Sequence, residues 1–474
     1  MKYLKNFFLL VVFMMKNIAC TEHKKVVVIG AGIAGLTTAY RLAQNGIDVH
    51  LYEAKPRVGG RILTALVDGH IAELGGQNIF DGAPATNMIN LINELGLTLN
   101  YDKIHFAPHY VDNNKLTALS ELLSKHNLNL EKLEVQLNEL ALSSSSLRVV
   151  LDQLLNPEDP VNKCVSTMIA GYEGTPLENL SPRYTETLMH MLLGGVCTAH
   201  SFEEIDNNRY FDHLTITGGN SLLPQALAQQ LDDRVHLNMP LKWVSQSASG
   251  QYQLTFQDGQ VVHADVLVLA NPCSTYGDIN FESNVIPESK LTAIRHVQYG
   301  TNAKILVPLT GNYQTKVQTI GDDIGTHFNA DETVLTIYCT KDLGFYTAQN
   351  IAELYTSKLP HLKLIYDEEN LPTSTPTIAR DEPFAQYKTP VGHSWPNDPY
   401  IKGSYHNIAP GQEEVLTALQ ELDREMVKTL FAPIDGKLFF AGEHASILMD
   451  VPGTLEAACE SGERTARMIQ RLIS

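Results

Sequence analysis

The chain has 474 residues, of which 44% are hydrophobic and 19% are charged, and this composition excludes a disordered protein. The length is too great for a single hydrophobic core and predicts two or three domains. The formal net charge of −18 argues against nucleic acid and anionic membrane as partners, and it favours the approach of cationic substrates.

The first twenty residues differ in character from the rest of the chain. Lys2 and Lys5 precede the apolar run Phe7–Met15, which is too short to span a bilayer but resembles the core of a secretory signal. The segment ends in Ile-Ala-Cys, which resembles a bacterial lipobox and makes Cys20 a candidate lipid anchor. A processed leader predicts a location in the bacterial cell envelope, either membrane-anchored or periplasmic. An uncleaved leader on a cytoplasmic enzyme is the alternative.

The segment 25–53 predicts a strand, a helix and a second strand. Val26–Ile29 is a continuous apolar run, as expected for a strand buried on both faces. Helical spacing follows, and one face of the predicted helix carries Leu36, Ala39, Tyr40 and Ala43. The second strand covers 50–52 and ends at Glu53.

Three glycines connect the first strand to the helix in G-x-G-x-x-G spacing. Gly30 permits a tight turn, Gly32 lets the backbone approach a pyrophosphate, and Gly35 lets helix and strand pack closely. Ala34 lies in the same helix start, whose amide groups would face the phosphates. Glu53 is placed to bind an adenosine ribose. Glycines can mark only a turn, but the strand, helix, strand and acid together predict dinucleotide binding.

Two further glycine segments follow and favour a flavin over a nicotinamide dinucleotide. The first is E-A-K-P-R-V-G-G-R, in which paired glycines between two arginines suit a backbone crossing near phosphate, with arginine forks able to pair it bidentately. The second is E-L-G-G-Q. The candidate cofactor residues in these segments are Ala54, Arg57, Gly60, Arg61, Gly75, Gly76 and Gln77.

These segments also carry a family resemblance. EAKPRVGGRI, ELGGQ, TGGNSLLPQAL, ADVLVLANP, LFFAGEH and GTLEAACESGERTA occur in the order seen in flavin-containing amine oxidases, and the match runs from Lys24 to the C-terminus. The resemblance implies an FAD-dependent amine oxidase with a mixed α/β fold. Its Rossmann-like FAD-binding domain, of the GR2 type, would carry an inserted α+β substrate-binding domain.

The resemblance implies discontinuous domains after the leader, which covers 1–20. The FAD-binding domain is expected from 24–100, 212–298 and 396–474, and the substrate-binding domain from 101–211 and 299–395. We expect 101–211 to be a helical insertion, with helical spacing from Leu116 to Leu155. Strands are expected near Leu237–Val244, Tyr252–Phe256 and Val266–Ala270, with a helix over Gly344–Leu359.

The resemblance assigns further cofactor contacts. Leu241 would lie against adenine, and Glu443 with Gly442 near the ribityl phosphate, although Glu443 could instead cap a turn. A helix opening near Thr454 and Leu455 would direct its N-terminus at the flavin, where it stabilises the anion formed on reduction. The inward face of this helix carries the small residues Ala458, Cys459 and Gly462. Six cysteines without metal-ligand spacing predict no metal site.

Three residues are candidates for a catalytic role. By the resemblance, Lys304 faces the flavin and holds a water near N5, although a lone lysine can also end a strand in solvent. Tyr405 matches one of two tyrosines that flank the amine in monoamine oxidases, and simple core packing is its alternative. Thr454 stands at the position of the other, so the aromatic cage is at best half present.

Two departures refine the expectation. Ser404 stands where monoamine oxidases carry the cysteine that binds FAD covalently, which predicts noncovalent FAD. Asn78 stands where L-amino acid oxidases carry an arginine that binds carboxylate, which argues against amino-acid substrates.

The expected activity is oxidation of a primary or secondary amine to an imine, which hydrolyses to an aldehyde. Oxygen would be the acceptor and hydrogen peroxide the product. One alternative is a desaturase or dehydrogenase of the same superfamily that acts on a carbon–carbon bond, and another is an FAD-binding redox protein without turnover. We expect a monomer or a homodimer.

Overall fold

A computed structural model describes residues 24–473, apart from 82–84, 106–108, 113–114, 119–120, 123–129, 193–209, 310–318, 322–323, 330, 364–365, 367–370 and 449–451. The leader and Cys20 therefore lie outside the described residues. Among the helices that the structure describes, none is long and apolar enough to cross a membrane.

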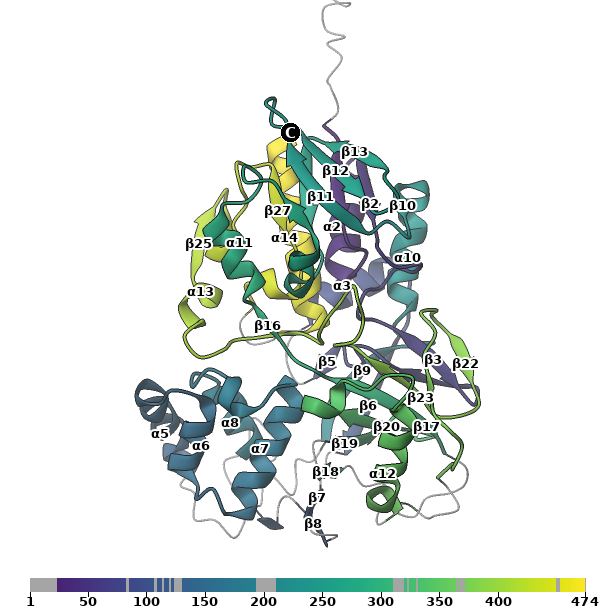
Figure 1. The fold of residues 1–474 in the computed structure, drawn as a ribbon, viewed down its shortest axis with the longest axis vertical. Coiled ribbons are helices and arrows are strands. Elements are labelled where there is room, and N and C mark those ends of the chain that lie inside the picture. The colour runs from purple at the N-terminus through teal and green to yellow at the C-terminus, as the bar shows by residue number, and fades with distance from the viewer. Residues whose placement is uncertain are drawn as a thin grey trace, which may run out of the picture.

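A parallel sheet forms the centre of the upper half of the molecule (Figure 1). In the described chain it has the strand order β10-β2-β1-β14-β27, and all neighbouring pairs are parallel. The strands are β1 (Val26–Ile29), β2 (Val49–Tyr52), β10 (Val235–His236), β14 (Val266–Leu269) and β27 (Leu438–Phe440). Strands from three distant parts of the sequence therefore meet in one sheet, which is expected where buried apolar runs alternate with covering elements.

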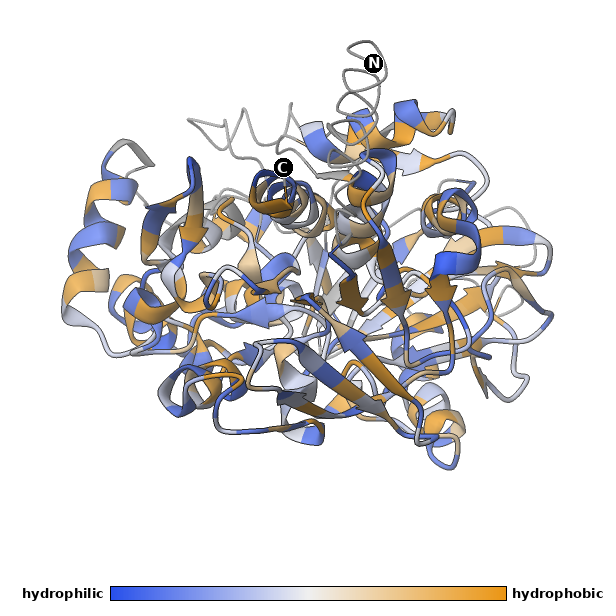
Figure 2. Ribbon diagram, turned by 90° about the horizontal axis from the view of Figure 1, so that it is seen from above, coloured by the Kyte–Doolittle hydropathy of each residue, from blue (hydrophilic) through white to orange (hydrophobic). Residues whose placement is uncertain are grey.

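Helices cover one face of this sheet and a second sheet covers the other. The helical face carries α2 (Ile33–Gln44), α3 (Thr86–Glu94), α10 (Leu222–Leu231) and α14 (Leu455–Ile473). The other face packs on α11 (Glu288–Arg295) and on a sheet of β11 (Leu241–Gln246), β12 (Tyr252–Phe256), β13 (Val261–Ala264) and β15 (Asn280–Phe281). Figure 2 shows orange, hydrophobic strands near the centre of the molecule and helices in which blue and orange bands alternate.

The lower half combines a large sheet with a group of helices. The sheet order is β21-β23-β17-β20-β19-β18-β7-β8 in the described chain, and α12 (Ile351–Lys363) packs on it. Its strands are β7 (His109–Asp112), β8 (Lys115–Ala118), β17 (Ala303–Pro308), β18 (Thr319–Gly321), β19 (Ile324–Phe328), β20 (Val334–Cys339), β21 (Thr377–Ile378) and β23 (Val391–Ser394). The helices are α5 (Leu130–Ser143), α6 (Leu147–Leu154), α7 (Pro160–Glu173) and α8 (Thr185–Leu192), which share a separate core.

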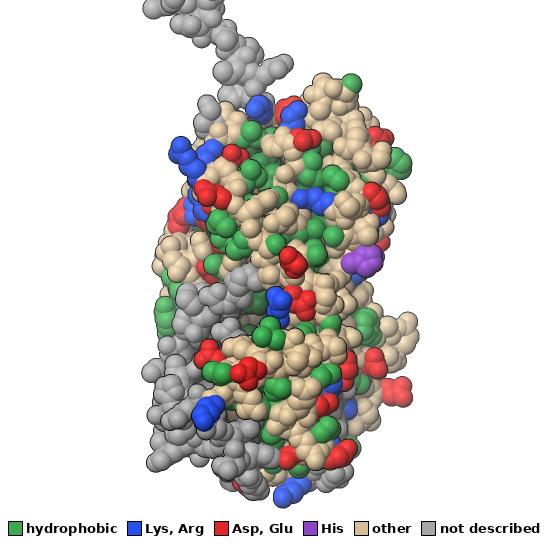
Figure 3. All heavy atoms as spheres, turned by 90° about the vertical axis from the view of Figure 1, so that its left-hand side faces the viewer, with side chains coloured by type: hydrophobic (Ala, Val, Ile, Leu, Met, Phe, Trp, Pro, Cys, Tyr) green, Lys and Arg blue, Asp and Glu red, His purple; other side chains and the backbone are tan. Residues whose placement is uncertain are grey.

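Short strands connect the two halves. They are β3 (Thr64–Val67), β4 (His70–Glu73) and β22 (Ala385–Tyr387) in one sheet, β5 (Phe80–Asp81), β6 (Leu99–His105) and β9 (Tyr210–Ile216) in another, and the pair β16 (Gln298–Tyr299) and β24 (His406–Asn407). The remaining elements are α13 (Glu413–Thr417) and the hairpin of β25 (Leu419–Leu422) and β26 (Glu425–Lys428). On the face that Figure 3 shows, acidic and basic side chains are interspersed.

The structure corrects three expectations about local structure. The start of the expected helical insertion is not helical, because β6 pairs with β9, and β7 and β8 join the lower sheet. The expected strand over Leu237–Val244 begins only at Leu241, with β11, because Asn238 adopts a φ of 59° in the segment between β10 and β11. The expected helix over Gly344–Leu359 begins only at Ile351. The residues before it form a turn, in which Asn350 Oδ1 accepts a hydrogen bond from the amide of Thr347 at 2.5 Å.

The helix α14 lies close against α2, and Gly462 makes this approach possible. A Cβ atom on Gly462 would lie 2.5 Å from the carbonyl oxygen of Ala34 and 2.9 Å from Cβ of Thr37. Thr38 Oγ1 also donates to the carbonyl of Gly462 at 3.2 Å. Gly462 therefore allows α14 to pack closely against α2.

Gly462→Ala should destabilise the protein by about 1–3 kcal/mol, because the added methyl group overlaps the backbone of α2. Gly171→Ala in α7 is the matched control, since a Cβ atom there meets no atom within 4 Å. Both changes gain helix propensity of about 1 kcal/mol, so only the clash separates them. Chemical denaturation measures both, and equal stability of the two variants would contradict the packing role.

Candidate active site

The first glycine loop leaves the N-terminus of α2 open. Gly32 is the N-cap of this helix, no side chain caps its first amides, and a Cβ atom on Gly32 would meet nothing within 4 Å. Gly30 has a φ of 103°, and a Cβ atom on Gly35 would lie 2.0 Å from the carbonyl oxygen of Gly30. The uncapped amides of the first turn, which include that of Ala34, form a binding site for an anion such as pyrophosphate.

The second glycine loop meets the first at this point. The amide of Gly59 donates to the carbonyl of Ala31 at 2.8 Å. Gly60 has a φ of 54°, and a Cβ atom there would lie 3.2 Å from Cα of Gly32. The two backbones therefore border one open space that lacks side chains, which fits the pyrophosphate of FAD.

Glu53 lies at the edge of the same space. Its carboxylate accepts the amide of Ala31 at 2.6 Å and the amide of Lys55 at 2.9 Å. Burial raises the pKa of Glu53, and these two amide bonds oppose the rise. The carbonyl of Glu53 accepts a hydrogen bond from the amide of Met239 at 2.8 Å. This bond holds the segment before the buried Leu241 next to Glu53. The structure thus brings Glu53, Ala54 and the start of β11 together.

Arg57 holds the second glycine loop in shape. Its guanidinium donates to the carbonyls of Val58, Gly60 and Ile62 at 2.9–3.1 Å, and to the carboxylate of Asp381. Four of its five N–H donors are therefore engaged in the ligand-free chain. The pairing of Arg57 with phosphate stays a prediction.

The partly exposed Arg61 forms an ion pair with the buried Glu443. Arg61 Nη1 lies 3.0 Å from Glu443 Oε1, and His406 Nδ1 bonds the second carboxylate oxygen. Burial favours the neutral acid, but the charges of His406 and Arg61 hold the pKa of Glu443 well below its ordinary value. Gly442, with a φ of 141°, donates its amide to Ser461 at 2.8 Å. Glu443 is thus a permanent carboxylate rather than a simple turn cap.

The third glycine segment surrounds Lys304. Lys304 Nζ donates to the carbonyl of Glu73 at 3.0 Å, to that of Gly75 at 2.8 Å and to Gln77 Oε1 at 3.4 Å. His327 Nε2 lies 3.2 Å from the same Gln77 oxygen. A lysine ammonium has three N–H groups, and three protein oxygens accept them. These contacts fix the strand β17 of the lower sheet against the glycine segment.

Lys304 is not a solvent-exposed residue at a strand end, because it is only 6% exposed. Burial lowers the pKa of Lys304 to about 8, and the nearby Glu73 opposes this. Burial in turn raises the pKa of Glu73 to about 7. A lysine that titrates near neutral pH in a dry site is typical of functional positions.

A cluster of tyrosines lies beside Lys304. The Lys304 ammonium lies 5.9 Å from the ring centre of Tyr338, and Tyr338 and Tyr405 share a side-chain hydrogen bond. Burial raises the pKa of both phenols. Gly453, with a φ of 73°, packs on the ring of Tyr405, since a Cβ atom there would lie 2.9 Å from Cδ2. Thr454 Oγ1 accepts the amide of Ala457 at 3.2 Å, so Thr454 begins α14 beside this ring.

The N-terminus of α14 also approaches the third glycine segment. A Cβ atom on Gly76 would lie 3.2 Å from Leu455 Cδ2. A Cβ atom on Gly75 would lie 2.1 Å from the carbonyl of Arg61, so no other residue fits there. The three glycine segments, the start of α14 and β17 are therefore in contact with one another.

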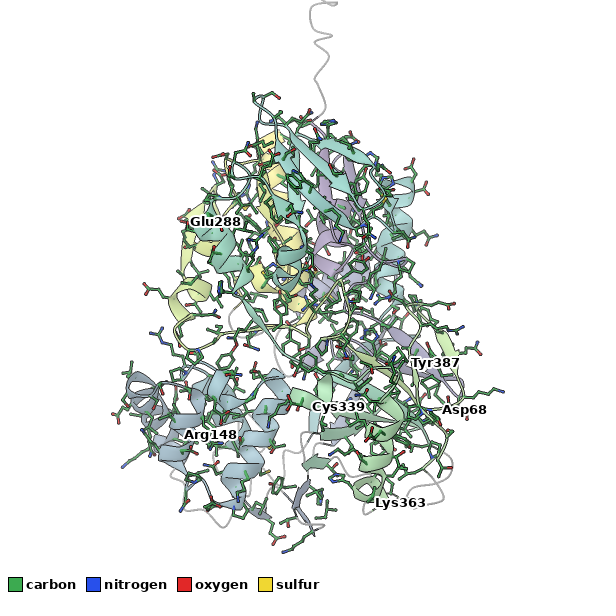
Figure 4. The ribbon with its side chains drawn as sticks, viewed as in Figure 1. Asp68, Arg148, Glu288, Cys339, Lys363 and Tyr387 are labelled. Atoms are coloured by element: carbon green, nitrogen blue, oxygen red, sulfur yellow. The ribbon has the colours of Figure 1, made fainter. Side chains whose placement is uncertain are left out.

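The sequence analysis did not identify several residues of this region. They are Glu173, His327, Tyr338 and His406. Tyr338 lies in the apolar run of β20, and this run indicates only a buried strand and no functional role. Cys339, labelled in Figure 4, follows Tyr338 at the end of β20, on the side of the lower sheet that faces the helices around Arg148. Contacts across the fold, rather than local motifs, bring these residues together.

Comparison with known proteins gives a consistent result. The family model described as flavin containing amine oxidoreductase matches residues 33–470. An L-amino-acid oxidase of Demansia vestigiata is 27% identical over 94% of this chain and 87% of its own length. Putrescine oxidase bound to putrescine superposes with a TM-score of 0.70 at 19% identity, over 94% of this chain and 99% of that one. Cyclohexylamine oxidase from Brevibacterium oxydans IH-35A gives 0.69 at 18% identity, over 95% and 99%.

Glu53→Ala should raise the dissociation constant for FAD about 10- to 100-fold, because it removes a buried hydrogen-bonding carboxylate beside the cofactor loops. Asp48→Asn is the matched control, since Asp48 precedes the same strand but its side chain is 45% exposed. Titration of the apoprotein with FAD, followed by flavin fluorescence, measures both. An unchanged affinity in Glu53→Ala would exclude the ribose role.

Proposed function

The chain belongs to the flavin-containing amine oxidoreductase family, and we propose that it oxidises a primary or secondary amine with molecular oxygen as the acceptor. The protein is an FAD-dependent oxidoreductase that acts on CH–NH₂ or CH–NH groups. The placement of Lys304 among Gly75, Gln77 and the tyrosines carries the proposal.

Bound FAD supplies the redox chemistry by accepting a hydride equivalent from the carbon that bears nitrogen. The amine thereby loses two electrons and two protons and becomes an imine, which water hydrolyses to an aldehyde and the free amine or ammonia. Oxygen takes up the two electrons and two protons and becomes hydrogen peroxide.

The protein residues orient the amine and exclude water. Tyr338 and Tyr405 are neutral phenols at physiological pH, because burial raises the pKa of each. Neutral aromatic rings suit the uncharged amine that must donate the hydride, and they also attract an ammonium ion on approach. Below about pH 8 Lys304 is positively charged. This charge would stabilise the negative charge that develops on oxygen as it is reduced.

Ser404 supports a noncovalent cofactor. A serine hydroxyl cannot form the thioether that a cysteine would, and Ser404 Oγ donates instead to Asn302 Oδ1. We propose that FAD is held by the glycine loops, Glu53 and the Arg61–Glu443 pair without a covalent bond.

Asn78 favours an amine over an amino acid. An L-amino acid needs a positive partner for its carboxylate, and Asn78 stands where that arginine is expected. The L-amino-acid oxidase relatives belong to the same family as this chain, but family membership does not determine its substrate.

Anaerobic bleaching of the flavin by a panel of monoamines, diamines and L-amino acids tests the proposal. We expect amines to bleach the oxidised spectrum and L-amino acids to leave it unchanged. A flavin that dithionite bleaches and every amine leaves oxidised would overturn the proposal. It would favour the desaturase or the redox protein without turnover.

Lys304→Met should slow the reaction of reduced enzyme with oxygen about 100-fold and affect reduction by amine much less. In the native enzyme this oxygen reaction should slow as pH rises through about 8, because the ammonium loses its proton there. Lys290→Met is the matched control, since burial lowers the pKa of Lys290 to about 8 but its Nζ donates to Ala432, on another element. Stopped-flow absorbance separates the two half-reactions, and equal slowing of both in Lys304→Met would refute the role.

A further inference from the structure

His327, in β19, is a half-buried imidazole that the proposed reaction does not use. Its Nε2 lies 3.2 Å from Gln77 Oε1, and Lys304 Nζ donates to the same oxygen at 3.4 Å. An ammonium group has only donors, so the oxygen of the Gln77 amide, rather than its nitrogen, faces this side. An amide oxygen only accepts hydrogen bonds, so His327 carries a proton on Nε2 and shares one acceptor with Lys304.

Strand register brings these two donors to the same side chain. Lys304 pairs with Tyr338 of β20, and His327 pairs with Thr336 of the same strand. Paired residues share a face of the sheet, and residues two apart in one strand also share it. Lys304, Tyr338 and His327 therefore lie on one face of the lower sheet. The rings of His327 and Tyr338 are edge-on, with their centres 6.2 Å apart.

The backbone of Gln77 is fixed separately from its side chain. Asn220 Nδ2 donates to the carbonyl of Gln77 at 2.7 Å and to that of Gly76 at 3.0 Å. The Gln77 side chain is half-buried, so water competes for its oxygen, and the bond from Lys304 is longer than usual. The second bond, from His327, stabilises the position in which this oxygen faces Lys304.

The Gln77 oxygen completes the hydrogen bonding of the Lys304 ammonium. The carbonyls of Glu73 and Gly75 accept two of its N–H groups at 3.0 and 2.8 Å, and Gln77 accepts the third. Burial lowers the pKa of Lys304 to about 8, and each acceptor opposes this because it stabilises the charged form. The titratable side chains on the elements packed against Lys304 are Glu73 in β4, Tyr338 in β20, His393 in β23 and His327 in β19.

We propose that His327 is a positioning residue, which holds the Gln77 side-chain oxygen in place as the third acceptor of the Lys304 ammonium. It acts through Gln77 and needs no contact with the substrate or with FAD. Its consequence for the reaction rests on the proposed function, in which the charge of Lys304 assists the reaction with oxygen.

The titration of Lys304 in the FAD-loaded protein tests the inference directly. Lysine labelled with ¹³C at Cε reports the charge of each lysine side chain by NMR, and Lys304→Met assigns the signal. We expect His327→Phe to lower the midpoint of the Lys304 titration by about one pH unit, because an ammonium that loses an acceptor gives up its proton more readily. Phenylalanine keeps an aromatic ring beside Tyr338 but has no N–H group.

Two further variants separate the hydrogen bond from packing. His327→Gln retains an N–H donor in place of Nε2 and should keep the native midpoint. Gln77→Met removes the acceptor itself and should lower the midpoint at least as much as His327→Phe. His263→Phe is the matched control, since His263 is exposed in β13 of the upper half. FAD content and circular dichroism establish that each variant is folded.

The outcomes separate the inference from the function on which it rests. An unchanged midpoint in His327→Phe, or a lowered one in His327→Gln, would overturn the inference. Where His327→Phe does not fold, an unchanged midpoint in Gln77→Met would overturn it as well. Stopped-flow absorbance gives the pH at which the reaction with oxygen slows in the same variants. If the Lys304 midpoint moves and this pH does not follow, the role of His327 stands and the proposed role of Lys304 fails.

Discussion

The contact between two backbone loops at the N-terminus of α2 determines where the rest of the site lies. Gly60 approaches Gly32 so closely that a Cβ atom on Gly60 would lie 3.2 Å from Cα of Gly32. The third segment joins through the amide of Gly76, which donates to the carbonyl of Arg61 at 3.0 Å. Lys304 then donates to the carbonyl of Gly75 and fixes the lower sheet to this backbone framework. Three glycine segments thus order the cofactor site and the substrate site in one continuous set of contacts.

Buried charges reinforce this framework because nearly every described one in this region has an opposite partner. Lys55 lies beside Asp398 and 3.1 Å from Asp381, which connects the loop after Glu53 to the segment that returns from the lower sheet. His393, 3.6 Å away, and the charge and hydrogen bond of Lys55 lower the pKa of Asp398, against the effect of burial. Removing one partner of such a pair would leave the other charge buried and unpaired, which costs free energy. The network therefore favours a single arrangement of the two halves.

Substrate choice is a separate matter from this framework. The similar proteins include an L-amino-acid oxidase, a putrescine oxidase and a cyclohexylamine oxidase, whose names give different substrates although they share fold or family with this chain. The glycine contacts would serve any of these reactions, because all of them need the same cofactor. The expectation that Asn78 disfavours amino-acid substrates concerns a position outside these contacts.

The sequence by itself determined the strand–helix–strand unit, the identity of the cofactor and the family. Each depends on glycines and apolar runs within short segments, where a local backbone conformation has few alternatives. Only the tertiary structure decided that Arg57 bonds the carboxylate of Asp381, that Lys304 is buried against Gly75, and that Tyr338 borders Tyr405. These depend on strand register and on how the lower sheet docks on the glycine segments, which arise from contacts between residues far apart in the sequence. No local pattern encodes such contacts, because the burial of many side chains at once selects them.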